Sequence, residues 1–435
     1  MGHLGHLKEQ YRELVTRLAA STVALPEPTD ERARAGFREI LEIMYTPEEA
    51  AIAARLPVAP ADLRTVAKSL GMAETDLRPK LDAMCDKGVV VDLVSKRTGE
   101  TRYLLSPPVV GFFEFSMMRA KDGIPKKRMA EALHAYMHGD DTFAREVFGG
   151  ETVLGRALVH ETALGETPDV LDWERATRIV SEATQHAVSL CYCRHEASHL
   201  GTACDAPQEV CLSLNGGAEF VIRRGFGRPV SKQEALDIMI DARKLGLVQI
   251  ADNVLDRPTY ICNCCGCCCG QLSAINEFGL RAVNPSGFLA SSDPAHCIGC
   301  SKCARACPIA AIEMKPERTS SKRKSDLRAV VDHERCIGCG VCVDACRKES
   351  MHVERRTEMP HVPKDAIEKS LRMALERGHL GDMLYSEGVA RGIGFLGEAL
   401  RALLALPPAQ RALASEQVTS RFVRAALGRV KDPSV

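Results

Sequence analysis

Two short segments of this chain each carry four cysteines at one spacing, C-x2-C-x2-C-x3-C. The first segment holds Cys297, Cys300, Cys303 and Cys307, and the second holds Cys336, Cys339, Cys342 and Cys346. Three thiolates from one tight loop can each bind a different iron of a single 4Fe-4S cubane. Structural zinc, the alternative, is usually bound by two well-separated pairs of ligands rather than by four cysteines in one short run. The spacing therefore predicts two 4Fe-4S clusters and a fold built around them.

The two segments are also an internal repeat, because Cys297 aligns with Cys336 at an offset of 39 residues. At the same offset Ile312 aligns with Met351. Apolar residues at equivalent positions of both halves are what a pseudo-twofold fold needs to shield two clusters from water.

Residues 285–357 resemble the two-cluster bacterial ferredoxins, through this doubled motif and the Pro308 that follows Cys307. The resemblance implies that the fourth cysteine of each motif binds the cluster of the other motif. One cluster is then held by Cys297, Cys300, Cys303 and Cys346, and the other by Cys336, Cys339, Cys342 and Cys307. Where the family has a proline after the last cysteine, this chain has Arg347. Because a cation stabilises the reduced, more negative state of a nearby cluster, we expect the two reduction potentials to differ.

The composition is that of a chain with room for two to four domains. It has 435 residues, of which 45% are hydrophobic and 26% are charged. Lysine plus arginine equal aspartate plus glutamate at 57 each, so the chain has no general attraction to nucleic acid or anionic lipid. It has no apolar run of about 18 residues, and residues 1–10 lack the apolar core of a signal peptide. We therefore expect a cytoplasmic protein of an anaerobic or microaerobic host, with its 19 cysteines as reduced thiolates bound to metal.

The N-terminal third of the chain predicts helices followed by a hairpin. The segment Thr46-Pro47-Glu48-Glu49 predicts a helix start, since Thr46 can cap the helix and Glu49 can return a hydrogen bond. Further helices are predicted over residues 63–70 and, capped by Thr75, over residues 76–87. Residues 89–94 and 101–105 predict the two strands of a β-hairpin. Helices followed by a hairpin of this size resemble a winged helix.

A winged helix suggests DNA binding through the helix over residues 76–87. That helix mixes three cations with three carboxylates and carries Pro79 in its predicted first turn. A helix that neutralises phosphates should have a cationic face. The sequence therefore favours a structural or partner-docking role over DNA recognition, and Cys85 in the same helix is interpreted as a core thiol.

The middle of the chain holds a second group of cysteines. The run Cys191-Tyr-Cys193-Arg194-His195 is expected at the end of a helix that begins near Trp173, and residues 231–245 predict another helix. The candidate metal ligands, of which only a subset binds any one metal, are Cys191, Cys193, Cys204, Cys211, Cys262, Cys264, Cys265, Cys267, Cys268 and Cys269. If residues 262–269 were extended, Cys262, Cys264 and Cys268 would face one side and Cys265, Cys267 and Cys269 the other, until Gly266 breaks the alternation.

Three interpretations of this region are open. The first is a third iron-sulfur cluster with ligands from both cysteine-containing segments of the middle domain, residues 191–211 and residues 262–269. Such a cluster would extend an electron-transfer chain. The second is structural zinc, with His195 or His199 as nitrogen ligands, although either histidine alone suits a surface position equally well. The third is a set of redox thiols without metal. Disulfides between adjacent cysteines are disfavoured, because neighbouring Cα atoms lie about 3.8 Å apart, below the usual disulfide range. Arg194 is a candidate hydrogen-bond donor to a cluster or an anionic substrate.

A broader resemblance covers most of the chain. The order of a winged-helix-like start, a C-x-C-R motif, a C-N-C-C-x-C-C-C run and a ferredoxin pair is similar to that of large ferredoxin-type proteins of anaerobic bacteria and archaea. This resemblance implies electron transfer and supplies no substrate.

Two further stretches suggest contacts with partners. Residues 315–328, between two predicted strands, carry six lysines and arginines against Glu317 and Asp326, and a basic hairpin tip beside clusters would attract an acidic redox partner. Beyond Pro363 the chain predicts helices. Their apolar residues are Ile367, Leu371, Leu375, Ile393, Leu396, Leu400, Leu403 and Leu404. Packing on the protein's own core is the favoured role for these faces, ahead of a partner subunit or a membrane surface.

The sequence as a whole predicts an α+β protein of several domains. These are a winged-helix-like domain (1–110), a Cys-rich α/β middle domain (111–284), a two-cluster ferredoxin-like domain (285–357) and a helical C-terminus (358–435). We expect an electron-transfer protein that is a subunit or partner of a larger oxidoreductase, rather than an enzyme acting alone. The alternatives are a reductase with a catalytic metal site in the middle domain and a redox-sensing DNA-binding regulator. The chain shows no glycine loop after a strand for a flavin or nicotinamide.

Overall fold

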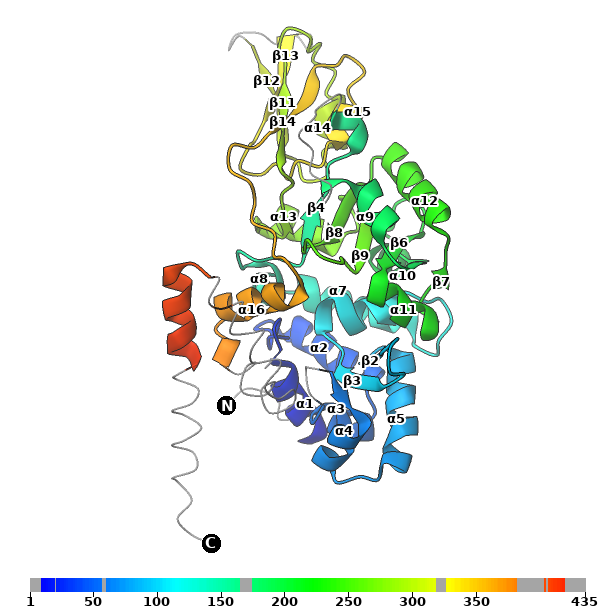
Figure 1. Cartoon of the computed structure of the whole chain (residues 1–435). Helices are drawn as coiled ribbons and strands as arrows, with labels where there is room; N and C mark the ends of the chain where they lie inside the picture. The colour runs from blue at the N-terminus through cyan, green and yellow to red at the C-terminus, as the bar shows by residue number, and fades with distance from the viewer. Residues whose placement is uncertain are drawn as a thin grey trace. The chain divides into compact units, whose positions relative to one another are not determined.

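The computed structural model describes residues 9–19, 21–56, 60–164, 174–317, 326–381, 403 and 406–418 (Figure 1). The protein is an α+β chain with several sheets. It divides into two compact units, residues 1–152 with 366–435, and residues 153–365. The division into the four domains expected from the sequence stays a prediction. In the described ranges, none of the helices is both long and apolar enough to cross a lipid bilayer.

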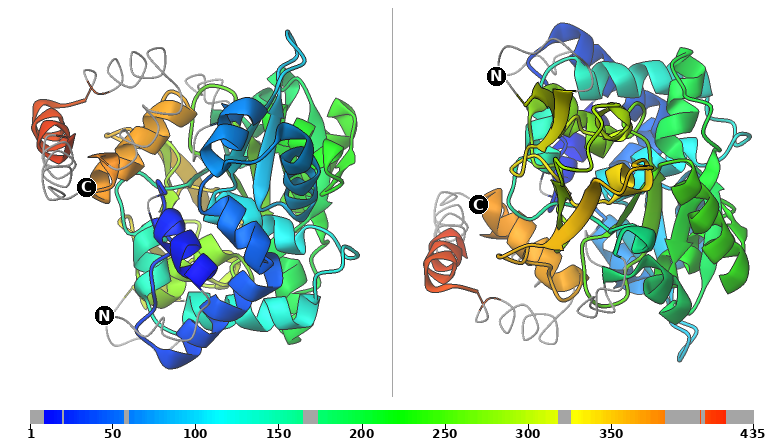
Figure 2. Two further views of the ribbon diagram at one scale, coloured as in Figure 1. Left: turned by 90° about the horizontal axis from the view of Figure 1, so that it is seen from below. Right: turned by 90° about the horizontal axis from the view of Figure 1, so that it is seen from above.

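The first unit is mainly helical. Its helices are α1 (Glu9–Ala19), α2 (Glu31–Met44), α3 (Pro47–Ala53), α4 (Leu63–Leu70), α5 (Glu74–Lys87), α6 (Phe113–Met117), α7 (Lys126–His138), α8 (Thr142–Phe148) and α16 (Ala366–Glu376). Its strands are β1 (Ala61–Asp62), β2 (Val90–Val94) and β3 (Thr101–Leu105), in the antiparallel order β1-β3-β2. The predicted hairpin is confirmed by the pairing of β2 with β3, and it projects from the helices of its unit in the left panel of Figure 2.

Local capping rules account for several helix ends of this unit. Thr46 and Glu49 form the predicted capping box at the start of α3. The prediction for α5 was wrong at its start, because the helix begins at Glu74 after Ala73 and Thr75 lies inside it. Pro79 is therefore inside the helix rather than in its first turn. An acidic first turn favours this earlier start even without a side-chain cap.

Apolar packing inside the first unit bears on two other predictions. Cys85 is fully buried in α5, as a core thiol should be. In α16, Leu371 and Leu375 pack with Leu406 and Ala414, so the described C-terminal apolar residues form a buried cluster with one another. The predicted contributions of Ile393, Leu396, Leu400 and Leu404 lie outside the described residues.

The second unit contains a seven-stranded sheet and two two-stranded ladders. Its strands are β4 (Gly155–Ala157), β5 (His186–Leu190), β6 (Glu209–Leu214), β7 (Arg228–Pro229), β8 (Val248–Asp252), β9 (Tyr260–Cys264), β10 (Val283–Asn284), β11 (Phe288–Ser292), β12 (Ile312–Pro316), β13 (Leu327–Val331) and β14 (Met351–Arg355). Its helices are α9 (Ala176–Glu182), α10 (Tyr192–Leu200), α11 (Asn215–Arg223), α12 (Lys232–Lys244), α13 (Gly270–Phe278), α14 (Lys302–Ala306) and α15 (Val341–Asp344).

The order of the large sheet is β10-β4-β8-β9-β6-β5-β7, and its pairs are antiparallel except β10 with β4. The ladders β11-β14 and β12-β13 lie side by side in the ferredoxin-like part (Figure 1). The predicted strands on either side of residues 318–325 are confirmed as β12 and β13. The helix α12 is confirmed too, with Ser231 as its N-cap.

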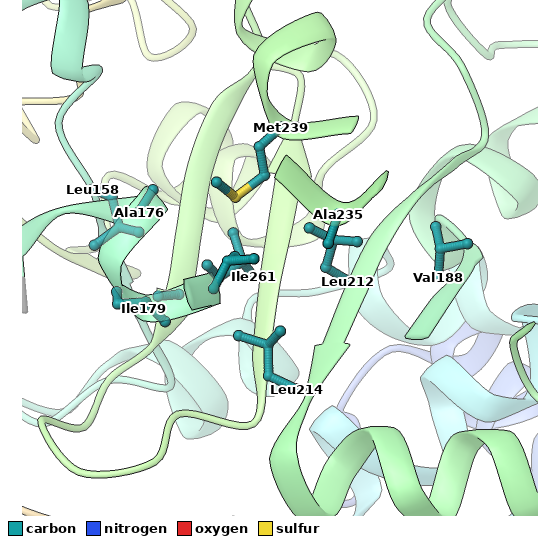
Figure 3. Close-up of a cluster of buried hydrophobic side chains, with 11 residues drawn as sticks. Leu158, Ala176, Ile179, Val188, Leu212, Leu214, Ala235, Met239 and Ile261 are labelled. Atoms are coloured by element: carbon teal, nitrogen blue, oxygen red, sulfur yellow. The ribbon is translucent and has the colours of Figure 1, made fainter. Parts of the chain in front are cut away.

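One face of the large sheet packs against α9 and α12. Val188, Leu212 and Ile261 from the strands meet Ile179 of α9 and Met239 of α12 in one buried cluster (Figure 3). Because side chains alternate along a strand, the residues next to these point to the opposite face. Two of those residues are cysteines, so the opposite face of the sheet carries the chemistry.

Candidate metal centres

The Cys191 motif lies at the end of a strand, which corrects the expectation of a long helix before it. Residues 186–190 form β5, Cys191 is the N-cap of α10, and Cys193 lies in the first turn of that helix. The preceding helix, α9, is short and ends at Glu182. A mixed five-residue segment such as His186–Leu190 suits either a helix or a buried strand, and pairing with β6 decides for the strand.

The sheet register brings cysteines from separate segments together. Leu212 of β6 pairs with Ile261 of β9, so the neighbouring residues Cys211 and Cys262 are cross-strand neighbours on one face. Cys264, two residues further along β9, shares that face. The chain then leaves the sheet in a turn and enters α13, whose N-cap is Cys269.

Four cysteines gather at this turn, and we call them the cysteine tetrad. They are Cys204, Cys265, Cys267 and Cys268, and their sulfur atoms all lie within 4.8 Å of one another. Individual sulfur–sulfur distances are 3.7 Å from Cys204 to Cys265, 3.6 Å from Cys267 to Cys268 and 3.9 Å from Cys268 to Cys204. The predicted alternation was therefore wrong for Cys268 and Cys269, because the backbone is extended only as far as Cys264.

The tetrad has the dimensions of a site for one metal ion. Four thiolates bound tetrahedrally with metal–sulfur bonds of about 2.3 Å lie about 3.8 Å from one another. A single zinc or iron ion fits that spacing, whereas each ligand of a cubane binds a separate iron. Burial raises the pKa of Cys204, but hydrogen bonds from the Ala206 amide and the other tetrad thiols outweigh it and lower that pKa to about 7. Cys267 is exposed, so the tetrad lies at the surface.

The other six middle cysteines form a separate group, which we call the six-cysteine arc. In spatial order they are Cys191, Cys193, Cys269, Cys264, Cys262 and Cys211, each in hydrogen-bonding contact with the next. None of the six is exposed. Hydrogen bonds from neighbouring thiols lower the pKa of Cys191, Cys262 and Cys269, and the donors Cys193 and Cys264 have raised pKa values.

Arg194 lies between the two groups. Its guanidinium is fully buried, and Nη2 donates to the Cys265 sulfur at 3.6 Å and to the Asn263 carbonyl at 3.1 Å. Its backbone amide donates to the Cys191 sulfur. Burial alone would lower the pKa of Arg194, but the thiolates of Cys191 and Cys265 raise it above its usual value. Arg194 therefore stays cationic beside both groups.

The histidines of α10 are the other predicted ligands. His195 Nε2 and His199 Nε2 are 3.2 Å apart. With Glu196 they form the pattern H-E-x-x-H, which is the zinc-binding helix motif and is a signal for this pair that the sequence itself carries. Among the described residues, the tetrad is the sole group of three or more His, Cys, Asp or Glu ligand atoms this close together. The histidine pair therefore lacks a third ligand within that distance in this part of the chain.

The ferredoxin-like part brings its cysteines together in two sets. Cys307, Cys336, Cys339 and Cys342 line one cavity, although Cys307 comes from the other motif. Burial raises the pKa of Cys303, and the neighbouring thiolates of Cys346 and Cys297 raise it further. Cys346 thus lies with the first motif. Apolar residues including Ala290, Ile312 and Met351 surround the cysteines, so the sites are shielded as cluster sites require.

Backbone amides donate to these thiols as well. The Ala311 amide donates to the Cys307 sulfur at 3.2 Å, and the Val341 amide donates to that of Cys339. Such bonds stabilise thiolate ligands and tune cluster potentials. The two groups of thiols, their shielding and these donors fit two 4Fe-4S clusters.

Comparison with known proteins gives a family match for the ferredoxin-like part of the chain. A family model described as a 4Fe-4S dicluster domain matches residues 296–350. Neither the curated proteins nor the solved structures contain a match to the chain. The chain therefore carries a 4Fe-4S dicluster domain within a larger protein, and this domain binds iron-sulfur clusters.

Proposed function

We propose that this protein is an iron-sulfur electron-transfer protein, in which electrons pass between the dicluster domain and the Cys-rich middle domain. The observation that carries this proposal is the contact of Gly266 with Pro308. A Cβ on Gly266 would lie 2.4 Å from the Pro308 carbonyl oxygen and 3.0 Å from its Cα. Gly266 stands between two tetrad cysteines, and Pro308 follows a cluster cysteine. The loops of the two centres are therefore packed backbone against backbone.

The contact sets an upper limit on the distance between the centres. One Cα–Cα step of about 3.8 Å on each side of the contact puts the Cα atoms of Cys265 and Cys307 no more than about 12 Å apart. Cys265 belongs to the tetrad, and Cys307 lies with the cysteines of the second motif. The two centres are therefore near neighbours. A bound cubane would store and release single electrons, and one electron lost there is one gained by the acceptor.

Polar contacts hold this junction in place. Asn276 of α13 donates to the Pro308 carbonyl at 3.0 Å. Arg335, the residue before Cys336, donates to the Asn276 side chain at 2.9 Å and to the carbonyl of Ile309. Because α13 begins directly after the tetrad loop, these bonds fix the loop relative to the cluster cysteines.

The reductase alternative has less support. Catalytic metal sites keep an open coordination position, whereas four cysteines close a tetrahedral site. The tetrad therefore suits an electron relay, if its ion is iron, or a structural role, if its ion is zinc. A larger oxidoreductase remains the proposed partner.

The basic hairpin has two paired cations in its described flanks. Lys315 pairs with Glu313 at 3.2 Å, and Arg328 pairs with Glu317 at 2.8 Å.

A rapid-reduction experiment tests the proposal. A one-electron donor is mixed with anaerobic protein, and the dicluster and middle centres are followed by freeze-quench EPR. Gly266→Ala should slow reduction of the middle centre several-fold without changing metal content, because the new methyl group pushes the two loops apart. Gly216→Ala is the matched control, since a Cβ there meets nothing within 4 Å.

A second variant removes the clusters from the route. Cys300→Ser combined with Cys339→Ser should leave the middle metal in place but slow its reduction by the same donor. Unchanged reduction kinetics in this variant would contradict the proposal.

A further inference from the structure

The six-cysteine arc is a built site in its own right. It joins residues from β6, β9 and the starts of α10 and α13, which the sheet order brings together from distant parts of the sequence. Sulfur contacts link arc members to one another, from Cys191 through Cys269 to Cys211. The tetrad sulfurs form their own set of contacts. The ten middle cysteines thus divide into two centres.

Two helix N-termini meet at the arc. Cys191 is the N-cap of α10 and Cys269 is the N-cap of α13, each helix being nine residues long. The Arg194 amide donates to the Cys191 sulfur, and the amides of Gln271 and Leu272 donate to that of Cys269. The positive ends of two helix dipoles therefore converge on thiolates, an environment that stabilises a negatively charged group.

A buried cation adds to this environment. The Arg194 side chain is fully buried, and its Nε–H has no acceptor among the described residues. A buried guanidinium without enough acceptors is costly, so an anionic group beside Arg194 is expected. Sulfide and thiolate ligands of a cluster would supply that charge.

The number of thiols identifies the class of ligand. A single tetrahedral ion takes four thiolates, and the tetrad already has the spacing for one. The arc has six thiols arranged in a row rather than around one point. We infer that the arc is a second middle centre, distinct from the tetrad, and that it holds a polynuclear iron-sulfur cluster. This inference concerns metal binding alone and does not require that electrons pass between the domains.

Acid-labile sulfide separates the two centres, because a single ion in the tetrad brings no sulfide. The two dicluster cubanes account for about eight irons and eight sulfides per chain. A cubane in the arc adds about four of each, so anaerobically reconstituted full-length protein should contain about twelve sulfides. A value near eight would overturn the inference.

Paired variants assign the extra sulfide. Cys193→Ser combined with Cys269→Ser should lower sulfide from about twelve to about eight and leave the tetrad ion bound. Cys267→Ser combined with Cys268→Ser should remove one metal ion and leave sulfide at about twelve. Cys85→Ser controls for the loss of a buried thiol elsewhere. Loss of sulfide in the tetrad variant would show one shared centre instead of two.

The test stands even if the arc variant fails to fold. Native mass spectrometry of the wild-type protein then reports the cluster masses, and the tetrad variant still reports whether sulfide follows the tetrad. If sulfide is near twelve but the dicluster and middle centres exchange no electrons, the proposed function fails while the arc assignment holds.

Discussion

The buried imidazole of His160 contacts the Asp344 carboxylate, with Nδ1 and Oδ2 2.7 Å apart. The other ring nitrogen, Nε2, lies 3.0 Å from the Leu247 carbonyl oxygen. Both partners are hydrogen-bond acceptors, so each ring nitrogen bonds to its partner only when it carries a hydrogen. The His160 amide also donates to the Cys339 carbonyl at 2.9 Å. These contacts therefore tie a cluster-binding loop to the large sheet.

Removing the charge of Asp344 should weaken this tie. Burial raises the pKa of Asp344, but hydrogen bonds from His160 and Thr162 outweigh it and lower the pKa. Such a carboxylate stabilises the fold above its unfolded pKa of about 4, and that stability is lost as the pH falls through the folded value. We expect Asp344→Asn to cost about 2 kcal/mol, less than a fully buried pair because the Asp344 side chain is 29% exposed.

Urea unfolding of the Asp344→Asn variant and the wild-type protein measures this cost. The difference should be constant from pH 5 to 7 and should shrink below about pH 4. Asp241→Asn is the control, since its ion pair with Lys244 is exposed and should contribute little. A cost no larger than that of the control would show that the His160 pair does not stabilise the fold.

Crossed ligation of the two cubanes can be tested one cysteine at a time. Cys307 lines a cavity with the cysteines of the second motif, and Cys346 lies near Cys303 of the first. Cys346→Ser should therefore damage the cluster of the first motif and spare the other. EPR of the reduced variant distinguishes the two clusters. Damage confined to the cluster of the second motif would contradict the crossed arrangement.

Glu196 should make stability depend on pH in the opposite direction to Asp344. Burial raises the pKa of this α10 carboxyl to about 8. Between about pH 4.5 and pH 8 the unfolded chain has lost the proton that the folded chain keeps, so stability falls as the pH rises. Glu196→Gln removes this penalty. The variant should gain little at pH 5 and up to about 5 kcal/mol above pH 8.

Denaturant unfolding at pH 5, 7 and 9 measures the gain, with the exposed Glu182→Gln as control. A difference between wild type and Glu196→Gln that does not change with pH would mean that the carboxyl titrates normally in the folded protein.

DNA binding by the first unit should be weak. Lys80 and Lys87 of α5 pair with Glu48 and Glu49 of α3, at 2.5 and 2.7 Å, so two cations of the candidate recognition helix are already neutralised. Glu48→Gln combined with Glu49→Gln frees both lysines. This variant should bind DNA more tightly than wild type, with a slope of log affinity against log salt steeper by up to about 2.

Fluorescence titration of genomic fragments over a salt series checks this expectation. A wild-type complex of sub-micromolar affinity at physiological salt that responds to cluster redox state would instead favour the regulator interpretation.

Local rules of the sequence predicted local structure. The capping box of Thr46, the β2-β3 hairpin and the helix after Ser231 each depend on residues a few positions apart, and each is found in the structure. The doubled cysteine motif likewise predicted the dicluster domain, because its spacing is a property of one loop.

The division of the middle cysteines could not be predicted in this way. It depends on β6 lying between β5 and β9, and sequence order gives no indication of that placement. It also depends on where β9 ends, since the turn after Cys264 sends Cys265 to the tetrad and Cys269 to the arc. The strand before Cys191 was mistaken for a helix because the five residues of His186–Leu190 are too few to show a helical or a strand period.

The sheet order also fixes when the middle centres can be assembled during biosynthesis. Cys191, Cys193, Cys204 and Cys211 leave the ribosome first, yet their partners arrive only with β9 and the turn that follows it. Until β9 inserts beside β6, neither centre has a complete set of ligands. On the proposed assignment, metal can therefore be loaded into both centres only after residue 269 has been synthesised.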